Sequence, residues 1–94
     1  MRYNRLGSTG LIVSELCLGA MTFGTDPGRF AEIAGMDQDA STAMVKQALD
    51  AGINFIDTAE MYAVPATQAT CGFTETYIGN WFAKNPGVRQ KLVL

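Results

Sequence analysis

The stretch DAGINFID, residues 50–57, decides the fold class of this 94-residue chain. Its glycine, Gly52, follows an amphipathic helical pattern and directly precedes the β-rich run INFI, residues 53–56. Glycine commonly ends helices, and a helix joined to a strand by so short a link is typical of βαβ units. The stretch therefore predicts an α/β protein whose strands are parallel and joined through helices.

The helix before this stretch is predicted to begin at Asp39, whose side chain can serve as the N-cap. Apolar residues recur every three or four positions along it, which indicates one buried face. That apolar stripe comprises Ala40, Met44, Ala48 and Ala51, widened by Val45 and Leu49.

A second helix is predicted to begin at Thr74 and Glu75 and to end before Pro86 and Gly87. Its large apolar side chains repeat at helical spacing, so they favour a packed core over an aromatic binding platform. They are Tyr77, Ile78, Trp81 and Phe82. Residues 92–94 then begin another strand.

The amino-terminal part of the chain predicts a β-hairpin followed by a buried strand. Residues 1–6 and 11–14 are short extended pieces around a Gly-rich turn. The apolar run at residues 16–21 is typical of a parallel strand covered on both faces, so Cys17 is expected to be buried and inert. Residues 25–38 lack periodicity and predict a long loop with at most one helical turn.

The composition indicates one small globular domain, since 48% of the residues are hydrophobic and 17% are charged. The formal net charge is −2, and the seven bases are scattered along the chain. Because they form no cluster that matches a row of phosphates, nucleic acid and anionic membrane are not expected as partners. The sequence has no apolar run near the roughly 20 residues of a membrane span, and we expect a cytoplasmic protein.

Histidine is absent, and the two cysteines are Cys17 and Cys71. Without histidine, these residues cannot form a Ser-His-Asp triad, a Cys-His pair or a histidine-ligated zinc site. The cysteines have neither the CxxC spacing of a metal or redox site nor the number that a disulfide framework needs, which fits a reducing cytosol. We therefore expect no metal site, and an exposed Cys71 without a function.

Asp57 and Tyr62 are the candidate catalytic pair. Asp57 ends the predicted strand and Tyr62 lies in the loop after it. Active sites of α/β proteins gather at the carboxyl ends of parallel strands, so the two side chains are expected to face one pocket. A phenol can donate a proton to a developing alkoxide, and a carboxylate can hold a cation that assists it. The alternative is structural: Asp57 caps the loop and Tyr62 packs its ring.

Two further pairs are weaker candidates. Gly19 and Gly24 bracket residues 20–23, where the lack of a Cβ lets a ligand approach the backbone. Their spacing is not that of a phosphate-binding loop, and turn formation is the alternative. Glu60 and Glu75 lie on separate elements, so solvated faces explain them better than a catalytic carboxylate pair.

Three stretches taken together resemble the amino-terminal part of the aldo-keto reductases. They are LGSTGLIVS at residues 6–14, LGAMTFG at residues 18–24 and DAGINFIDTAEMY at residues 50–62. The stretches EMYAVP, residues 60–65, and TETYIGNW, residues 74–81, resemble the bacterial Tas-type branch of that family. The resemblance implies a (β/α)8 TIM barrel, of which this chain would supply the hairpin, two βα units and the start of the third strand.

The resemblance also implies a reaction, in which NADPH reduces an aldehyde or ketone. Tyr62 would donate the proton to the carbonyl oxygen, and Asp57 would hold a catalytic lysine whose positive charge assists the tyrosine. The segment Gly19, Ala20 and Met21, together with Asp57, would line the nicotinamide and its ribose. A threonine often stands in the family where this chain has Ala20.

The chain ends at Leu94, before the positions at which the family has its lysine and its histidine. Because such a barrel takes about 250 residues, we expect residues 1–94 to be a partial barrel domain. The full-length parent is then an NADPH-dependent carbonyl reductase, and the 94 residues alone are inactive. Two alternatives stay open: a non-enzymatic, nicotinamide-binding regulatory subunit of the same fold, and a small protein that self-associates through its open sheet edge.

Overall fold

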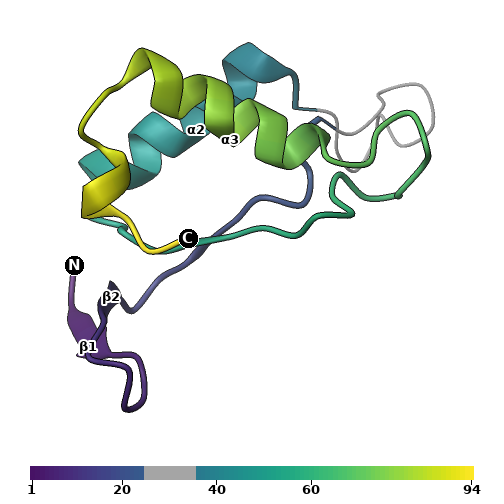
Figure 1. Ribbon diagram of the computed structural model, residues 1–94. Coiled ribbons are helices and arrows are strands. Elements are labelled where there is room, and N and C mark those ends of the chain that lie inside the picture. The colour runs from purple at the N-terminus through teal and green to yellow at the C-terminus, as the bar shows by residue number, and fades with distance from the viewer. Residues whose placement is uncertain (25–35) are drawn as a thin grey trace.

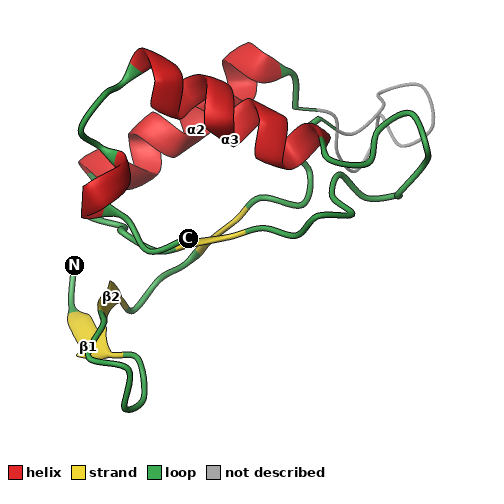
Figure 2. Cartoon of the chain, viewed as in Figure 1, coloured by secondary structure: helices red, strands yellow, loops and turns green. Residues whose placement is uncertain are grey.

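The computed structural model describes residues 1–24 and 36–94. The predicted loop at residues 25–38 therefore falls mostly outside the described residues. Figures 1 and 2 show helices α2 and α3 packed together on one side of a short parallel strand pair, with a hairpin projecting beyond one end. The elements are β1 (Tyr3–Arg5), β2 (Ile12–Ser14), β3 (Leu18–Gly19), α2 (Gln38–Asp50), β4 (Ile56–Asp57), α3 (Phe73–Lys84) and the 3-10 helix η1 (Arg89–Lys91).

The predicted hairpin is confirmed, since β1 and β2 pair antiparallel with Tyr3 opposite Ser14. Asn54, which lies just before β4, fastens the hairpin to the rest of the chain. Its side-chain oxygen accepts from the Ser14 amide at 2.7 Å, and its side-chain nitrogen donates to the Ile12 carbonyl at 3.0 Å. The hairpin is thus attached at the amino end of β4.

The prediction of an α/β chain with parallel strands is also confirmed. Strand β3 pairs parallel with β4, which places Gly19 opposite Asp57. Phe55 makes a further parallel bridge with Val93, so the predicted strand at residues 92–94 lies beside β4. The turn between α2 and β4 forms where expected, and Gly52 adopts a φ of 93° there.

The parallel strands are covered by helices on one face, and the prediction that residues 16–21 are covered on both faces is wrong. Leu16 is 59% exposed, and Cys17, predicted to be buried, is exposed. Successive strand residues point to opposite faces, so Leu18 turns toward the helices and Cys17 turns away from them. The buried core lies between strands and helices and contains Ala20, Phe23, Val45, Ile56, Ile78, Trp81 and Leu92.

Helix α2 begins earlier than predicted, because its N-cap is Asp37 and not Asp39. The Asp37 carboxylate accepts from the Ala40 amide at 2.8 Å, as an N-cap side chain does. The first residue of the helix, Gln38, donates from its side chain to the Tyr77 carbonyl of α3 at 3.2 Å. This contact between the two helices stabilises a start that the local pattern did not indicate.

The buried face of α2 also differs from the predicted stripe. Ser41, Val45 and Ala48 are buried, whereas Ala40 is exposed and Met44 is 39% exposed. Both sets have helical spacing, so periodicity alone does not distinguish them. The neighbouring helix and the strands select the face that carries the small Ser41 side chain.

Helix α3 confirms the predicted core face, with Ile78 and Trp81 buried and Tyr77 and Phe82 half-buried. The Trp81 and Phe82 rings meet edge to face at a centroid distance of 5.5 Å. The chain leaves α3 through η1 and reaches Val93 beside β4. Among the described residues, no helix has both the length and the apolar character that crossing a membrane requires.

Candidate functional site

The carboxyl ends of β3 and β4 are joined by two backbone hydrogen bonds. The Ala20 amide donates to the Asp57 carbonyl at 3.0 Å, and the Val64 amide donates to the Met21 carbonyl at 3.0 Å. The first bond fixes Asp57 beside the segment that follows β3, and the second fixes the loop after β4 to the same segment. Tyr62 lies two residues before Val64, so both candidate catalytic residues lie at this end of the strands.

The loop that carries Tyr62 is held at the tyrosine itself. The Tyr62 amide donates to the Ala59 carbonyl at 3.1 Å, and the Tyr62 carbonyl accepts from the Gly72 amide at 2.9 Å. The Tyr62 residue is half-buried, and Asp57 is exposed. The backbone thus holds a phenol and a carboxylate at one edge of the sheet, with the carboxylate open to a cation.

The segment predicted to contact a cofactor offers accessible surface on both sides of a buried residue. Gly19 is exposed, and a Cβ built on it meets nothing within 4 Å. Met21 is 49% exposed, whereas Ala20 is 0% exposed and its amide donates to the Asp57 carbonyl. The bare backbone at Gly19, which pairs with Asp57, leaves room for a ligand to approach the chain closely.

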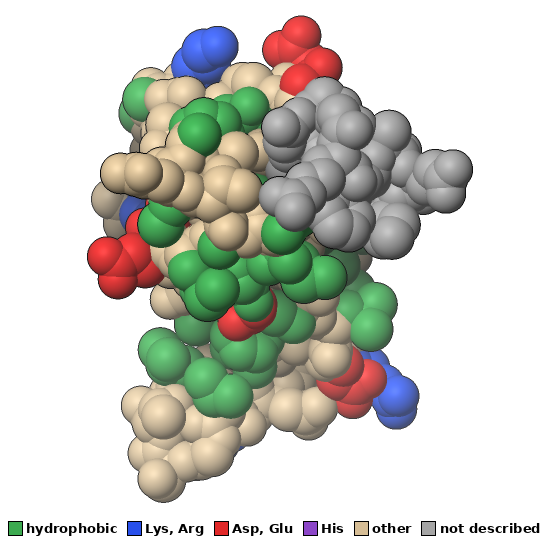
Figure 3. All heavy atoms as spheres, turned by 90° about the vertical axis from the view of Figure 1, so that its right-hand side faces the viewer, with side chains coloured by type: hydrophobic (Ala, Val, Ile, Leu, Met, Phe, Trp, Pro, Cys, Tyr) green, Lys and Arg blue, Asp and Glu red, His purple; other side chains and the backbone are tan. Residues whose placement is uncertain are grey.

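Apolar side chains gather at this end of the molecule, which faces the viewer in Figure 3, and an acidic side chain lies among them. Exposed apolar residues on the two loops include Met21 at 49%, Met61 at 54% and Val64 at 38% exposed. Ligand sites commonly combine an apolar lining with a few polar groups that orient the ligand. The mixture of apolar and acidic groups is compatible with a small organic ligand.

Cys17 lies on the same open face as Asp57. Partial burial of its sulfur raises the pKa of the Cys17 thiol, and the Asp57 carboxylate raises that pKa further. Cys71 is exposed, as predicted, and its thiol lies 3.6 Å from the Glu60 carbonyl. In residues 1–24 and 36–94 there is no group of three or more side chains that could hold a metal ion.

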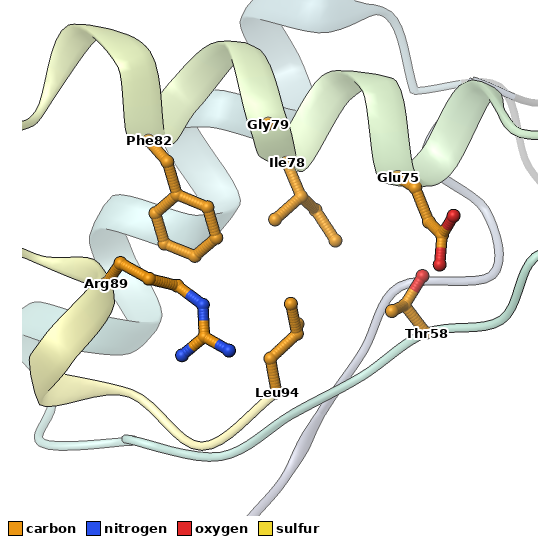
Figure 4. Close-up of a pocket in the computed structure, with 7 residues that line it drawn as sticks. All are labelled: Thr58, Glu75, Ile78, Gly79, Phe82, Arg89 and Leu94. Atoms are coloured by element: carbon orange, nitrogen blue, oxygen red, sulfur yellow. The ribbon is translucent and has the colours of Figure 1, made fainter.

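A pocket of about 180 Å³ lies between α3, η1 and the end of the chain. Figure 4 shows the Thr58 hydroxyl and the Glu75 carboxylate at one end of it and Arg89 at the other. Arg89 is already engaged, since it donates to the Leu92 carbonyl at 3.1 Å and lies over the Phe82 ring. Glu75 thus lines this pocket while Glu60 does not, so the structure does not bring the two carboxylates together in it.

Sequence reasoning missed two residues that organise the site. Val64 ties the tyrosine loop to Met21 through its backbone, for which no sequence signal exists. Thr74 is fully buried, and its hydroxyl donates to the Phe23 carbonyl at 2.6 Å. A hydroxyl residue at a helix start signals capping, and the distant partner becomes visible only in the fold.

Comparison with known proteins identifies relatives of several lengths. The chain is 46% identical over 94 residues to Protein tas of Escherichia coli and 35% identical over 92 residues to 6-dehydroglucose reductase of Novosphingobium aromaticivorans. It covers 24% of the first and 27% of the second, so it spans about a quarter of these relatives. It is also 35% identical to an uncharacterized 11.2 kDa protein of Pseudescherichia vulneris, of which it covers 82%.

A family model supports the same grouping over most of the chain. The model of the Aldo/keto reductase family matches residues 15–94, which include β3, both helices and β4. The match therefore covers Asp57, Tyr62 and the segment at residues 19–21. From residue 15 to its last residue, this chain belongs to the aldo/keto reductase family.

Proposed function

We propose that the chain supplies part of the active site of an NADPH-dependent carbonyl reductase whose full-length form reduces an aldehyde or ketone. The observation that carries the proposal is the pair of backbone hydrogen bonds at the strand ends, Ala20 to Asp57 and Val64 to Met21. They bring the proposed proton donor, its acidic partner and the proposed cofactor segment to one edge. Carbonyl reduction needs these three functions side by side.

We further propose that residues 1–94 are a partial barrel domain. Parallel pairing of β3 with β4 and of Phe55 with Val93, with both helices on one face, supports the beginning of a (β/α)8 barrel. In this arrangement the hairpin lies at the amino ends of the strands and the candidate site at their carboxyl ends. That is the end at which barrel enzymes have their active sites.

Each proposed site residue has a distinct task. The Tyr62 hydroxyl gives a proton to the substrate oxygen as negative charge develops there. The Asp57 carboxylate attracts the cation that makes this proton transfer easier. When bound, NADPH supplies the hydride for the carbonyl carbon. Gly19 and Met21 offer accessible surface to its nicotinamide and ribose, and Ala20 holds Asp57 in register through its amide.

The 94 residues alone are proposed to be inactive, because they do not include the family's lysine, which follows a few residues further along the third strand, or its histidine, which lies one strand further. The parent protein is proposed to act in the cytoplasm on a small carbonyl compound, without nucleic acid or membrane as a partner. The acidic net charge of −2 and the scattered bases support the latter part. Catalytic reduction of a simple aldehyde with NADPH by the purified 94-residue chain would overturn the proposed inactivity.

One observation favours a second candidate function. An 11.2 kDa relative is matched over 82% of its length, so a chain of about this size occurs among the relatives. The exposed residues Leu16 and Cys17, which directly precede β3, would suit a small protein that self-associates through this strand. Sedimentation of the purified chain distinguishes the two, since a well-folded multimer supports self-association and a monomer opposes it. The regulatory-subunit alternative predicts nicotinamide binding without turnover.

A chimera tests the proposed reductase. Residues 1–94 replace the aligned segment of 6-dehydroglucose reductase, and NADPH-dependent reduction of 6-dehydroglucose is measured. We expect activity in the chimera and a loss of about 10² to 10⁴ in kcat for Tyr62→Phe. Tyr77→Phe is the matched control, because that half-buried tyrosine lies on α3 and has no part in the proposed reaction, and it is expected to retain the rate. A folded chimera without activity, or equal rates for the two variants, would rule the proposal out.

A further inference from the structure

Thr74 makes the most deeply buried side-chain hydrogen bond of the described chain between segments far apart in sequence. The residue is 0% exposed, and its hydroxyl donates at 2.6 Å to the carbonyl of Phe23, which is 1% exposed. The two residues are 51 positions apart. Phe23 lies two residues after the segment proposed to contact the cofactor, so this bond holds the end of that segment near the start of α3.

The same helix start also holds the proposed proton donor. The Tyr62 carbonyl accepts from the Gly72 amide at 2.9 Å and from the Thr74 amide at 3.5 Å. These amides belong to the first turn of α3, where backbone donors lack partners inside the helix and the helix dipole is positive. A single helix end therefore binds the Tyr62 loop through its backbone and the Phe23 segment through the Thr74 side chain.

A third contact joins the Tyr62 loop directly to the cofactor segment. In this contact the Val64 amide donates to the Met21 carbonyl at 3.0 Å. The fit beside Thr74 is tight, because a Cβ on Gly24 would lie 2.7 Å from the Phe73 Cβ. The turn after Phe23 is thus pressed against the beginning of α3.

The Thr74 hydroxyl does not serve its own helix. The N-cap of α3 is Gly72, which offers no capping side chain, and the Thr74 hydroxyl turns to another segment. Thr76, in the same turn of the helix, shows the ordinary local behaviour, since its hydroxyl donates at 2.9 Å to the Gly72 carbonyl. Thr76, whose hydroxyl bonds within its own helix, therefore serves as a control for Thr74, whose hydroxyl bonds to a residue 51 positions away.

We propose that Thr74 is a positioning residue, which sets the Tyr62 loop against the cofactor segment at residues 19–21. This inference rests on the proposed function for its catalytic meaning. Loss of the hydroxyl removes the donor that α3 gives to the buried Phe23 carbonyl and so releases the segment from α3. The tyrosine then loses its fixed distance from the cofactor surface while its own chemistry stays intact.

We call the contacts of Thr74 with Phe23 and Tyr62 the clamp. Amide hydrogen exchange in the 94-residue chain tests this clamp without the need for enzymatic activity. Thr74→Val keeps the shape and removes the donor, and we expect exchange at Gly72 and Val64 to accelerate at least about tenfold. Thr74→Ser keeps the donor and is expected to stay within about twofold of the unsubstituted chain. Thr76→Val, the matched control, is expected to leave both amides unchanged. Equal exchange in Thr74→Val and Thr76→Val would overturn the proposal.

A measurement on the unsubstituted chain keeps the test decisive if Thr74→Val does not fold. As urea is raised below the unfolding transition, Gly72 and Val64 are expected to open together, because one clamp protects both amides. Separate opening of the two would also overturn the proposal.

Kinetics of the reductase chimera test the catalytic meaning. For Thr74→Val we expect kcat to fall roughly 10- to 100-fold with little change in KM, and Thr74→Ser to restore it. An unchanged kcat in an active chimera would refute the positioning role. An inactive unsubstituted chimera would count against the proposed function alone, since exchange in the 94-residue chain still decides whether Thr74 forms the clamp.

Discussion

The Tyr3 hydroxyl donates a 2.6 Å hydrogen bond to the Gly52 carbonyl, 49 positions further along the chain. This bond joins the first strand of the hairpin to the turn between α2 and β4. The turn precedes β4, whereas Asp57 and Tyr62 lie at and beyond its carboxyl end. The hairpin contacts and the candidate site thus occupy opposite ends of the parallel strands, so changes in the hairpin are expected to affect stability and leave the site intact.

Tyr3→Phe removes this bond and keeps the ring. Because the bond is exposed to solvent, we expect the free energy of unfolding to fall by only about 1 kcal/mol. Urea unfolding followed by the fluorescence of the buried Trp81 measures the change. Tyr77→Phe, in a ring that stacks on Phe73, is the control and is expected to cost less. Equal losses of unfolding free energy in the two variants would show that the hydrogen bond from Tyr3 to Gly52 does not stabilise the fold.

Gly52→Ala is expected to be more damaging, because Gly52 has a φ of 93° and little space. A Cβ there would lie 3.0 Å from the Tyr3 hydroxyl oxygen and 3.1 Å from the Met1 Cβ. We expect a loss of about 1–2 kcal/mol in the free energy of unfolding. Gly79 lies inside α3, where a Cβ meets nothing within 4 Å, so Gly79→Ala is expected to gain about 0.5–1 kcal/mol. The unfolding temperature is therefore expected to fall for Gly52→Ala and to rise for Gly79→Ala. Shifts of the same sign would contradict the different backbone requirements assigned to the two glycines.

Asn54→Ala tests the second attachment of the hairpin. The Asn54 side chain satisfies the Ser14 amide and the Ile12 carbonyl, and Ser14 is only 2% exposed. Without these partners, we expect a loss of about 2 kcal/mol in urea unfolding. Asn80→Ala is the matched control, since its side chain donates to the exposed end of Gln38 on the helix surface, and alanine favours a helix. A loss in the control as large as that in Asn54→Ala would show that the hairpin contacts do not matter.

The helix-to-strand unit around Gly52 could be predicted because its signals are local. A glycine that ends the helix, and a short β-rich run after it, act over a few residues. The hairpin was predictable for the same reason, from the Gly-rich turn between its strands. The strand end at Asp57 followed directly, and with it the placement of Tyr62 in the next loop.

The features that the sequence did not reveal depend on partners distant along the chain. Asp37 caps helix α2, and the contact of the Gln38 side chain with α3 further stabilises a start at Gln38. The buried face contains Ser41 because α2 packs with that face against the rest of the fold. Cys17 was misjudged because a continuous apolar run indicates a buried strand but not how many layers cover it. The bond from Thr74 to Phe23 spans 51 residues and has no local signature.

The negative charge of Asp57 acts on the Cys17 thiol. Alkylation of this cysteine is therefore a probe of the face of β3 that no helix of the described residues covers. Burial and the Asp57 carboxylate both raise the pKa of the Cys17 thiol, and only the thiolate reacts. Asp57→Asn removes the charge, lowers that pKa and enlarges the thiolate fraction below it. We therefore expect iodoacetamide to label Cys17 about threefold faster at about pH 8, and the difference to vanish at higher pH, where the thiol is ionised in both chains. Cys71, which is also exposed, serves as the internal control in the same mass spectra. An unchanged ratio of the two labelling rates would mean that the Asp57 carboxylate does not act on this face of β3.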